Sequence, residues 1–307
     1  GSATRWWLHH SLHDLAKQLS DSGSRLIFAR GEALSVLREL IAQTGARTVH
    51  WTRCYEPHAI ERDKRIRRAL ADDGIEVESF KGSLLFEPWE IETKTGGPYQ
   101  VFSPFWKMAL THPAPDKPLP APSSLHSPGN WPDSLALDEL ELLPKIDWAE
   151  GLRETWVPGE RGAARRLDQF LEHTLEDYKD ARDFPDRVGT SMLSPHLHHG
   201  ELSPRQIWHR VREAGDAAEG HVRFNARKNE PTSRKSAFAF LREIGWREFG
   251  YHLLYHFPRT TDHPLRERFE DFPWRDNDEQ LRAWQSGKTG YLIIDAAMRQ
   301  LWHTGWM

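Results

Sequence analysis

Apolar positions in the first 80 residues alternate between short runs and helical spacings. Residues 5–19 have the pattern of an amphipathic helix, and helical spacing returns over Ala33–Ala42 and over Pro57–Asp73, where Pro57 suits the first turn. Short apolar runs between these segments predict three strands, at Leu26–Ala29, Thr48–Thr52 and Ile75–Phe80. Strands that alternate with helices predict a parallel α/β sheet with right-handed crossovers. No GxGxxG motif is present, so the dinucleotide fingerprint is absent.

The second half of the chain has helical patterns and few β-branched runs, which predicts an all-α domain. Its helices are expected at Ala163–Tyr178, Ser203–Ala214, Ser236–Tyr255, Asp278–Ser286 and Tyr291–His303. A stretch rich in Pro and Ser, from Pro113 to about Pro144, separates the two halves. We therefore expect an α/β domain over 1–112, a linker over 113–160 and a helical domain over 161–307. No opening strand precedes the first helix and no closing signal follows the last, so we expect both domains to be incomplete.

Composition is that of a globular protein, with 38% hydrophobic and 28% charged residues. No apolar run reaches the ~20 residues of a membrane span. The single cysteine, Cys54, excludes an internal disulfide framework and indicates a reducing, cytoplasmic setting. The net charge of -4 gives no global basic field, but residues 221–235 carry five Lys and Arg against one acid. Such a strip is typical of a solvated loop or of a local phosphate contact.

Hydroxyls and glycine cluster in the segment 189–206, GTSMLSPHLHHGELSPRQ. Gly189, Thr190, Ser191 and Ser194 stand beside a predicted helix start, where backbone N–H groups and hydroxyls suit the pyrophosphate of a nucleotide cofactor. A simple helix cap accounts for the same residue types. The nearby histidines His196, His198 and His199 have no carboxylate or cysteine at ligand spacing, so we expect no metal.

A charged pair and two aromatic rings share one face of the helix predicted in 238–258, FAFLREIGWREFGYHLLYHFP. Phe240, Glu243, Trp246 and Gly250 follow helical spacing, and Arg247 comes four residues after Glu243. Burying such a pair in a core is costly, which favours a binding role. The indole would stack on a flipped base, the carboxylate would accept N–H hydrogen bonds or share a proton, and the arginine would bind phosphate. A surface ion pair beside a buried Trp explains the pattern equally well.

Tryptophan is unusually abundant, with 14 residues, four of them in the last 34 positions. Trp274 and Trp284 have the residue type needed for an electron-hopping chain beside a redox cofactor. By spacing alone, packing in an aromatic core is the favoured interpretation.

Taken together, these segments resemble the DNA photolyase/cryptochrome family. The resemblance rests on YKDARDFP (178–185), GTSMLSPHLHHGELSPRQ (189–206), GWREFGYHLLYHFP (245–258) and AWQSGKTGYLIIDAAMRQLWHTGWM (283–307), with YEPHAIERD (55–63) and YQVFSPFWKMAL (99–110) in the α/β part. It implies a Rossmann-like α/β antenna domain and an all-α domain that binds FAD. It further implies that reduced flavin, excited by blue light, splits a cyclobutane pyrimidine dimer flipped out of UV-damaged DNA.

The resemblance also implies roles for individual residues. The DNA contacts would be Arg182, Arg247 and Gly250, and the lesion contacts that serve catalysis would be Glu243 and Trp246. Trp274 matches the outermost tryptophan of the electron-transfer chain that reduces the flavin. The implied flavin contacts are Tyr178, Thr190, Ser191, Met192, Leu193, Ser194 and Phe240. Met192 stands where many members carry arginine, and Phe240 where many carry tryptophan.

The family pattern leaves three questions open. Folate-binding members carry an Asn-Glu pair where this chain has His58-Ala59, so the antenna pigment is either a deazaflavin or a folate, or is absent. A signalling cryptochrome and a (6-4) photolyase share the flavin motifs and are the alternatives to a dimer photolyase. Family members continue beyond Trp306-Met307 into residues around the flavin ring, so we expect these 307 residues alone to bind FAD weakly and to lack repair activity. We expect a monomer, as is usual in the family.

Overall fold

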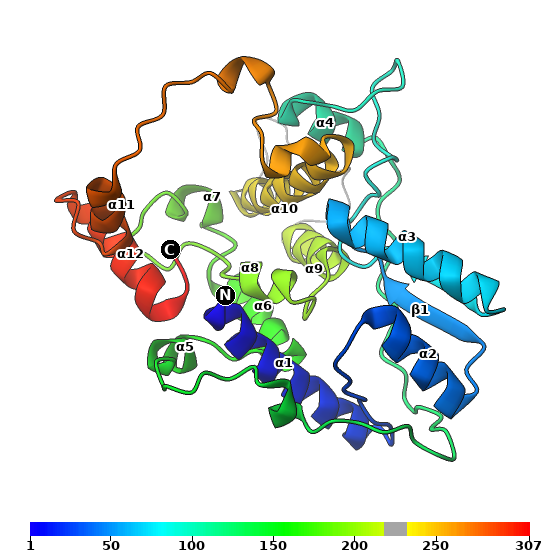
Figure 1. Ribbon diagram of the computed structural model, residues 1–307. Coiled ribbons are helices and arrows are strands. Elements are labelled where there is room, and N and C mark those ends of the chain that lie inside the picture. The colour runs from blue at the N-terminus through cyan, green and yellow to red at the C-terminus, as the bar shows by residue number, and fades with distance from the viewer. Residues whose placement is uncertain (218–231) are drawn as a thin grey trace.

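The computed structural model describes residues 1–217 and 232–307. Figure 1 shows an α/β part at one side, a central group of helices around α10, and α11 with α12 at the opposite side. The predicted order of an α/β part followed by helices is confirmed, because no strand occurs in 161–217 or 232–307. The basic strip at 221–235 lies almost entirely outside the described residues.

The α/β part is a two-stranded parallel sheet with its crossover helix. β1 (Thr48–Thr52) and β2 (Glu76–Phe80) pair in register from their first residues to their last. Parallel neighbours need a crossover connection, which α3 (Pro57–Asp72) supplies with Pro57 in its first turn. α2 (Ala33–Thr44) packs against α3 and ends at Gly45, whose φ of 69° suits glycine. The helices predicted at Ala33–Ala42 and Pro57–Asp73 are confirmed as α2 and α3. The strands predicted at Thr48–Thr52 and Ile75–Phe80 are confirmed as β1 and β2.

The strand predicted at Leu26–Ala29 is wrong. This segment makes no ladder with β1 or β2. Its backbone bonds go instead to the connecting segment, where Phe28 N–H donates to Ser134 Oγ (2.9 Å) and Phe28 C=O accepts from Leu135 N–H (2.9 Å). An apolar run this short forms a strand only where a neighbouring strand offers hydrogen bonds. Here the connecting segment at Ser134 and Leu135 offers them instead.

The first helix, α1 (Ser2–Asp21), extends beyond the predicted 5–19 and packs against the helical half of the protein. Its Trp6 and Trp7 are buried in a small cluster with Ala149, Leu152 and Trp156. α1 also contacts α6 (Glu160–His173) and the 3-10 helix η1 (Leu137–Leu140). These two tryptophans therefore serve packing.

The main hydrophobic core joins α4 (Phe102–Ala109) to the helical half. α4 and the residues just before it contribute Leu85, Phe86, Ile91, Phe102, Phe105, Trp106 and Ala109. They pack with α6, α9 (Pro204–Ala217) and α10 (Thr232–His256). The helix predicted over Ala163–Tyr178 ends at His173, and Tyr178 begins the short helix α7 (Tyr178–Ala181).

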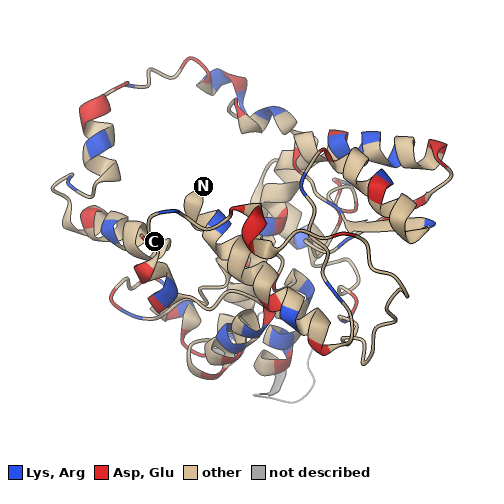
Figure 2. Ribbon diagram, turned by 60° about the horizontal axis from the view of Figure 1, so that its bottom comes forward, with Lys and Arg blue, Asp and Glu red and all other residues tan. Residues whose placement is uncertain are grey.

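The remaining elements lie around this core. They are α5 (Glu150–Thr155), α8 (Ser194–His198), η2 (Pro258–Thr261), η3 (Glu267–Phe269), α11 (Asp278–Gln285) and α12 (Leu292–Thr304). α12 packs on α5 so closely that a Cβ at Gly151 would lie 2.2 Å from the His303 carbonyl oxygen. Basic and acidic residues are interspersed over the helices (Figure 2). Among the described helices, none combines the length and the apolar character needed to cross a membrane.

One side of α10 holds the irregular backbone of residues 83–99, which we call the 83–99 segment. Arg247 Nη1–H donates to the Ser83 carbonyl oxygen (2.5 Å). Glu248 Oε2 accepts from Leu85 N–H (2.8 Å) and Phe86 N–H (3.2 Å). Glu248 is buried, so these bonds satisfy backbone donors that water does not reach.

Two histidines continue this contact toward the end of α10. His252 Nε2 accepts from Tyr99 N–H (3.0 Å), so the proton of the neutral ring is on Nδ1, which donates to the Pro88 carbonyl oxygen (3.1 Å). His256 Nε2–H donates to the same oxygen (2.9 Å). Side chains from three successive turns of α10 thus pair the backbone groups of the 83–99 segment.

Burial shifts the pKa values of two groups in this contact in ways that oppose each other. Burial raises the pKa of Glu248 to about 7, although Arg247 and the bonded N–H groups lower it. Burial and the neighbouring His256 lower the pKa of His252 to about 4. The stability from Glu248 is therefore present below its ordinary pKa of 4.5 and is lost as pH rises through about 7. The stability from His252 is present above its ordinary pKa of 6.5 and is lost as pH falls through about 4.

We predict that Glu248→Gln and His252→Gln change the pH dependence of stability in opposite directions. Between pH 4.5 and 6.5, the slope of the free energy of unfolding against pH should be more positive in E248Q than in the parent protein, because the opposing contribution of Glu248 is lost. In H252Q this slope should be less positive than in the parent protein, because the contribution of His252 is lost. Urea denaturation at several pH values measures both slopes. Equal slopes in all three proteins would contradict this account.

Candidate functional site

The exposed side of α10 presents the residues expected to touch a lesion. Trp246 is 44% exposed, and a Cβ added to Gly250 would meet nothing within 4 Å, so the surface here is open. Glu243 pairs with Arg182, whose Nη1 lies 2.6 Å from Glu243 Oε1. The structure thus brings together two predicted site residues that are 61 positions apart in the sequence.

Arg182 also connects this surface to the core beneath it. Its Nη1 lies 3.4 Å from the Tyr178 hydroxyl, and its guanidinium lies 5.6 Å from the centre of the Tyr178 ring. The hydrogen bond to Glu243 raises the pKa of Arg182, which keeps the guanidinium charged. An anionic DNA backbone would therefore meet a permanent positive charge beside a carboxylate that is already paired.

Tyr178 and Phe240, two of the expected flavin contacts, are buried core residues. Their rings meet edge to face at 5.2 Å, and both also contact the ring of Phe170. Burial raises the pKa of the Tyr178 hydroxyl, which therefore stays protonated. Any flavin contact made by these two rings would come from side chains in fixed positions.

Residues 189–194, the other expected flavin contacts, form a sharply bent loop that ends at Ser194, the first residue of α8. Gly189 is packed on α7, since a Cβ there would lie 2.3 Å from the Ala181 carbonyl oxygen. Met192 has a φ of 54°, in the left-handed region that a non-glycine residue rarely adopts. The buried Leu193 anchors the loop in the main core.

The hydroxyls of this loop are available to a ligand. The side chains of Thr190, Ser191 and Ser194 make no hydrogen bond within the part of the chain that the structure describes. The alternative that they cap α8 is wrong, because the N-cap residue is Leu193 and no side chain caps the helix. Free hydroxyls on a bent loop fit the phosphates of a nucleotide cofactor.

A buried carboxylate, Glu201, holds α8 in place behind the loop. Its Oε1 accepts from Trp7 Nε1–H and from Gly159 N–H, each at 2.8 Å. Its Oε2 lies 2.5 Å from His196 Nδ1. Burial alone would raise the pKa of Glu201, but these hydrogen bonds, with that of His196 the strongest, hold it below the ordinary value. This cluster joins α1, the start of α6 and α8.

Two of the three histidines in this segment have hydrogen-bond partners. His196 is bound to Glu201, and His199 Nδ1 lies 3.0 Å from the Pro195 carbonyl oxygen. Across the described ranges, no group of three or more His, Cys, Asp or Glu side chains is arranged to hold a metal ion.

Two further predicted residues lie in different surroundings. Arg247 is engaged by the Ser83 carbonyl and lies 5.0 Å from the ring centre of Tyr251, so a phosphate contact would have to replace that bond. Trp274 is 79% exposed and contacts the ring of Phe272 at 4.6 Å. The DNA role of Arg247 and the electron-transfer role of Trp274 stay predictions.

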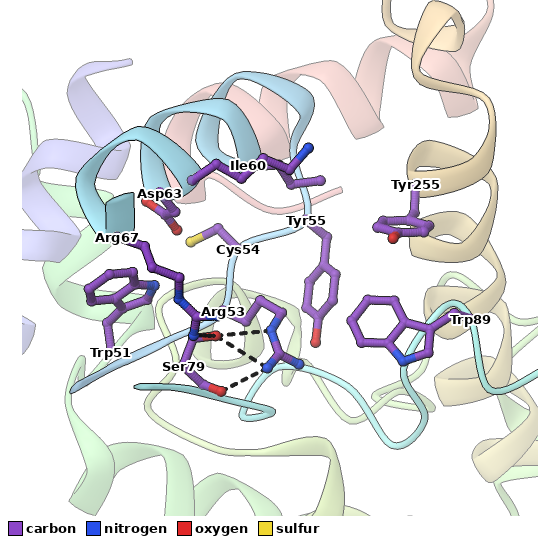
Figure 3. Close-up of a pocket in the computed structure, with 11 residues that line it drawn as sticks. Trp51, Arg53, Cys54, Tyr55, Ile60, Asp63, Arg67, Ser79, Trp89 and Tyr255 are labelled. Atoms are coloured by element: carbon purple, nitrogen blue, oxygen red, sulfur yellow. Dashed lines mark hydrogen bonds between the residues drawn. The ribbon is translucent and has the colours of Figure 1, made fainter. Parts of the chain in front are cut away.

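A pocket that the sequence patterns did not indicate lies between the α/β part and the end of α10, with a volume of about 190 Å³. In Figure 3, Trp51 stands at one side of it and Trp89 with Tyr255 at the other. The walls come from β1, α3, β2, the 83–99 segment and α10, which is why no local sequence pattern revealed them. The only signal in the sequence was the excess of tryptophan.

Charged side chains line the same pocket. Arg53 is fixed by Glu87 and by Ser79, whose carbonyl oxygen accepts from Nη2 at 2.7 Å. Lys64 and Arg67 add two more cations, against one carboxylate from Asp63. The indole Nε1–H of Trp51 is buried and has no acceptor within the described chain. Aromatic walls, a cationic rim and an unpaired donor suit a planar anionic ligand.

The chain is similar to known proteins in both of its halves. Residues 1–123 match the family described as DNA photolyase, and residues 240–307 match the FAD binding domain of DNA photolyase. The chain is 45% identical over its whole length to deoxyribodipyrimidine photo-lyase from Agrobacterium fabrum. This chain belongs to the photolyase/cryptochrome family.

The chain is similar to photolyases and also to cryptochromes. The crystal structure of a class III photolyase from Agrobacterium tumefaciens superposes over the whole chain with a TM-score of 0.91 and 44% identity. Cryptochrome-1 of Arabidopsis thaliana is 34% identical over the whole chain. The chain spans 61% of the Agrobacterium fabrum photo-lyase, 61% of the class III photolyase and 44% of the plant cryptochrome.

We predict that Glu201→Ala destabilises the protein by about 3–5 kcal/mol, because it leaves buried donors of Trp7, Gly159 and His196 without their acceptor. Glu201→Gln should lose less, since its amide oxygen can still accept from Trp7 Nε1–H and Gly159 N–H. Urea denaturation measures both variants. An E201A protein as stable as the parent would show that this cluster does not hold α8.

Proposed function

We propose that the protein of which these residues form part is a blue-light-driven, FAD-dependent photolyase acting on cyclobutane pyrimidine dimers. The observation that carries the proposal is the surface of α10, where an exposed indole stands beside an ion-paired carboxylate and open helix surface. A flipped-out dimer needs an aromatic platform, a polar partner for its base edges and a cation for the neighbouring phosphate. Trp246, Glu243 and Arg182 supply one of each.

The residues divide the work of binding. Trp246 would stack on the splayed pyrimidines, and Glu243 would accept N–H groups or share a proton with a base carbonyl. Arg182 orients Glu243 through their 2.6 Å contact and faces the backbone phosphates. This arrangement positions a lesion without an acid–base triad.

The FAD proposal rests on the 189–194 loop and the match of 240–307 to a FAD-binding family. Thr190, Ser191 and Ser194 would bind the phosphates, Met192 and Leu193 shape the loop, and Tyr178 and Phe240 belong to the same core cluster as Leu193. Bound, reduced FAD would supply the light-driven electron that splits the dimer. The chain's own part is to hold the cofactor beneath the lesion surface and to exclude water from its core side.

Two alternatives share these features. A cryptochrome photoreceptor would bind flavin and respond to light without repairing DNA. The 34% identity to a plant cryptochrome supports this alternative. A (6-4) photolyase would act on the other ultraviolet photoproduct. The pairing of Glu243 with Arg182 beside Trp246 favours the dimer enzyme, because it supplies the complete set of contacts named above.

We predict light-dependent repair of an oligonucleotide with one thymine cyclobutane dimer by the full-length protein. Trp246→Ala should weaken dark binding of this oligonucleotide about 5- to 150-fold, since stacking on an aromatic side chain contributes ~1–3 kcal/mol per base. Trp148→Ala is the matched control, because Trp148 is similarly exposed, at 43% against 44%, and lies outside the site. Gel shift and chromatography of the repaired strand provide the readouts.

The outcomes separate the three functions. Repair of the dimer alone supports the proposal. Repair of a (6-4) oligonucleotide alone would assign the other enzyme, and no repair with photoreducible flavin bound would assign a photoreceptor.

We also propose that the pocket of Figure 3 holds the ring system of an antenna pigment. Its volume of about 190 Å³ is below the ~300 Å³ at which pockets for drug-sized ligands begin, so it fits a ring system better than a whole dinucleotide. The cationic rim of Arg53, Lys64 and Arg67 would suit the carboxylates of a folate tail, whereas His58-Ala59 stands where folate-binding members carry Asn-Glu. A deazaflavin is the alternative.

We predict that Trp51→Ala and Trp89→Ala each remove a copurifying pigment that absorbs in addition to flavin. Flavin content should stay unchanged in both, because neither residue adjoins the 189–194 loop. Absorbance spectra and mass spectrometry of the released pigments check this. Retention of the pigment by both variants would place the antenna elsewhere.

The setting of this activity is part of the proposal. The free thiol of Cys54 supports a reducing cytoplasm, and we propose that the protein acts as a monomer on UV-damaged DNA.

A further inference from the structure

The indole of Trp246 lies flat on a second aromatic ring. The centres of the Trp246 and Phe102 rings are 3.7 Å apart, and their planes differ by 10°. Phe102 is only 5% exposed, whereas Trp246 is 44% exposed. One face of the indole is therefore covered by protein, and the exposed part of the side chain is what a ligand would meet.

The Phe102 ring is itself fixed from below. Trp106, one turn later on α4, lies parallel to it at 12° with ring centres 6.3 Å apart. Trp106 packs against α10 at Gly245, where a Cβ would lie 2.6 Å from Trp106 Cε3. Only glycine permits this approach without a shift, so the residue before Trp246 sets how closely α4 and α10 pack. Three parallel rings thus run from the core to the surface.

Phe102, which covers one face of the Trp246 indole, affects stacking on the other face in two ways. It fixes the plane of the exposed face, so that less side-chain freedom is lost when a base binds. It also leaves a single face for stacking, which limits a flipped dimer to one approach. Arg242, whose guanidinium lies 6.0 Å from the Phe102 ring centre, flanks the same stack at the surface.

We propose that Phe102 is a positioning residue for lesion recognition, which holds Trp246 in a fixed plane for one-sided stacking on the flipped pyrimidines. This inference rests on the proposed dimer-binding function of Trp246. Phe102 itself touches no substrate, and its effect passes through the indole. It gives α4, which precedes the helical half in the sequence, a role in the lesion site.

The test is a double-mutant cycle in the full-length protein. Phe102→Leu removes the ring but keeps apolar volume, and Phe102→Tyr keeps the ring. F102L should weaken dark binding of a dimer-containing oligonucleotide about 3- to 10-fold, whereas F102Y should bind it as the parent protein does. Neither variant should change the binding of undamaged DNA. In a Trp246→Ala background, F102L should have no further effect. An equal loss in both backgrounds would assign Phe102 to general stability and overturn the proposal.

A second measurement needs no DNA. With 5-fluorotryptophan incorporated, the ¹⁹F resonance of residue 246 is assigned from its loss in Trp246→Phe. In F102L this resonance should become narrower, and its chemical shift should move toward that of a solvent-exposed 5-fluorotryptophan. In F102Y its chemical shift should stay that of the parent protein. An unchanged resonance in F102L would overturn the positioning role. If the parent protein does not prefer dimer-containing DNA, the proposed function fails, while the ¹⁹F result still decides whether Phe102 fixes the indole.

Discussion

The pairing of buried backbone groups in the 83–99 segment by side chains of α10 is the interaction on which the rest of the structure depends. Glu248 accepts two backbone N–H bonds, and His252 bridges an N–H and a carbonyl. Unpaired polar groups at these depths would cost roughly 1–3 kcal/mol each. Because these bonds hold this side of α10 against the 83–99 segment, its opposite side faces solvent. The exposure of Trp246 is thus a consequence of polar pairing on the other side of the same helix.

The same constraint assembles both candidate sites from distant parts of the sequence. The 83–99 segment leads directly into α4, so its attachment to α10 brings Phe102 under Trp246 and Trp89 beside Tyr255. The 189–194 loop is held separately, through Leu193 in the core and Glu201 behind α8. The surface of α10 around Trp246 and the pocket near the sheet therefore depend on the same contact, whereas the 189–194 loop depends on a second one.

Much of the fold followed from periodicity, and the failures have physical causes. β1, α3 and α12 could be predicted because their patterns are long or bounded by Pro and Gly. Leu26–Ala29 could not, because a short apolar run becomes a strand only where a neighbour offers a ladder. In the site, the sequence predicted that Glu243 and Trp246 lie on one face of a helix. The partner of Glu243 could not be predicted, since Arg182 follows the end of α7, far away in the sequence, and the nearer Arg247 binds Ser83. Phe102 and the pocket around Trp51 depend on tertiary packing, which one sequence does not encode locally.

The most direct test of the central claim is a crystal structure of the full-length protein bound to duplex DNA with one thymine cyclobutane dimer. The account predicts the dimer flipped out onto the exposed face of Trp246, with Glu243 within hydrogen-bond distance of a base edge and Phe102 still parallel beneath the indole. A dimer that remains in the duplex, or that binds away from α10, would contradict it.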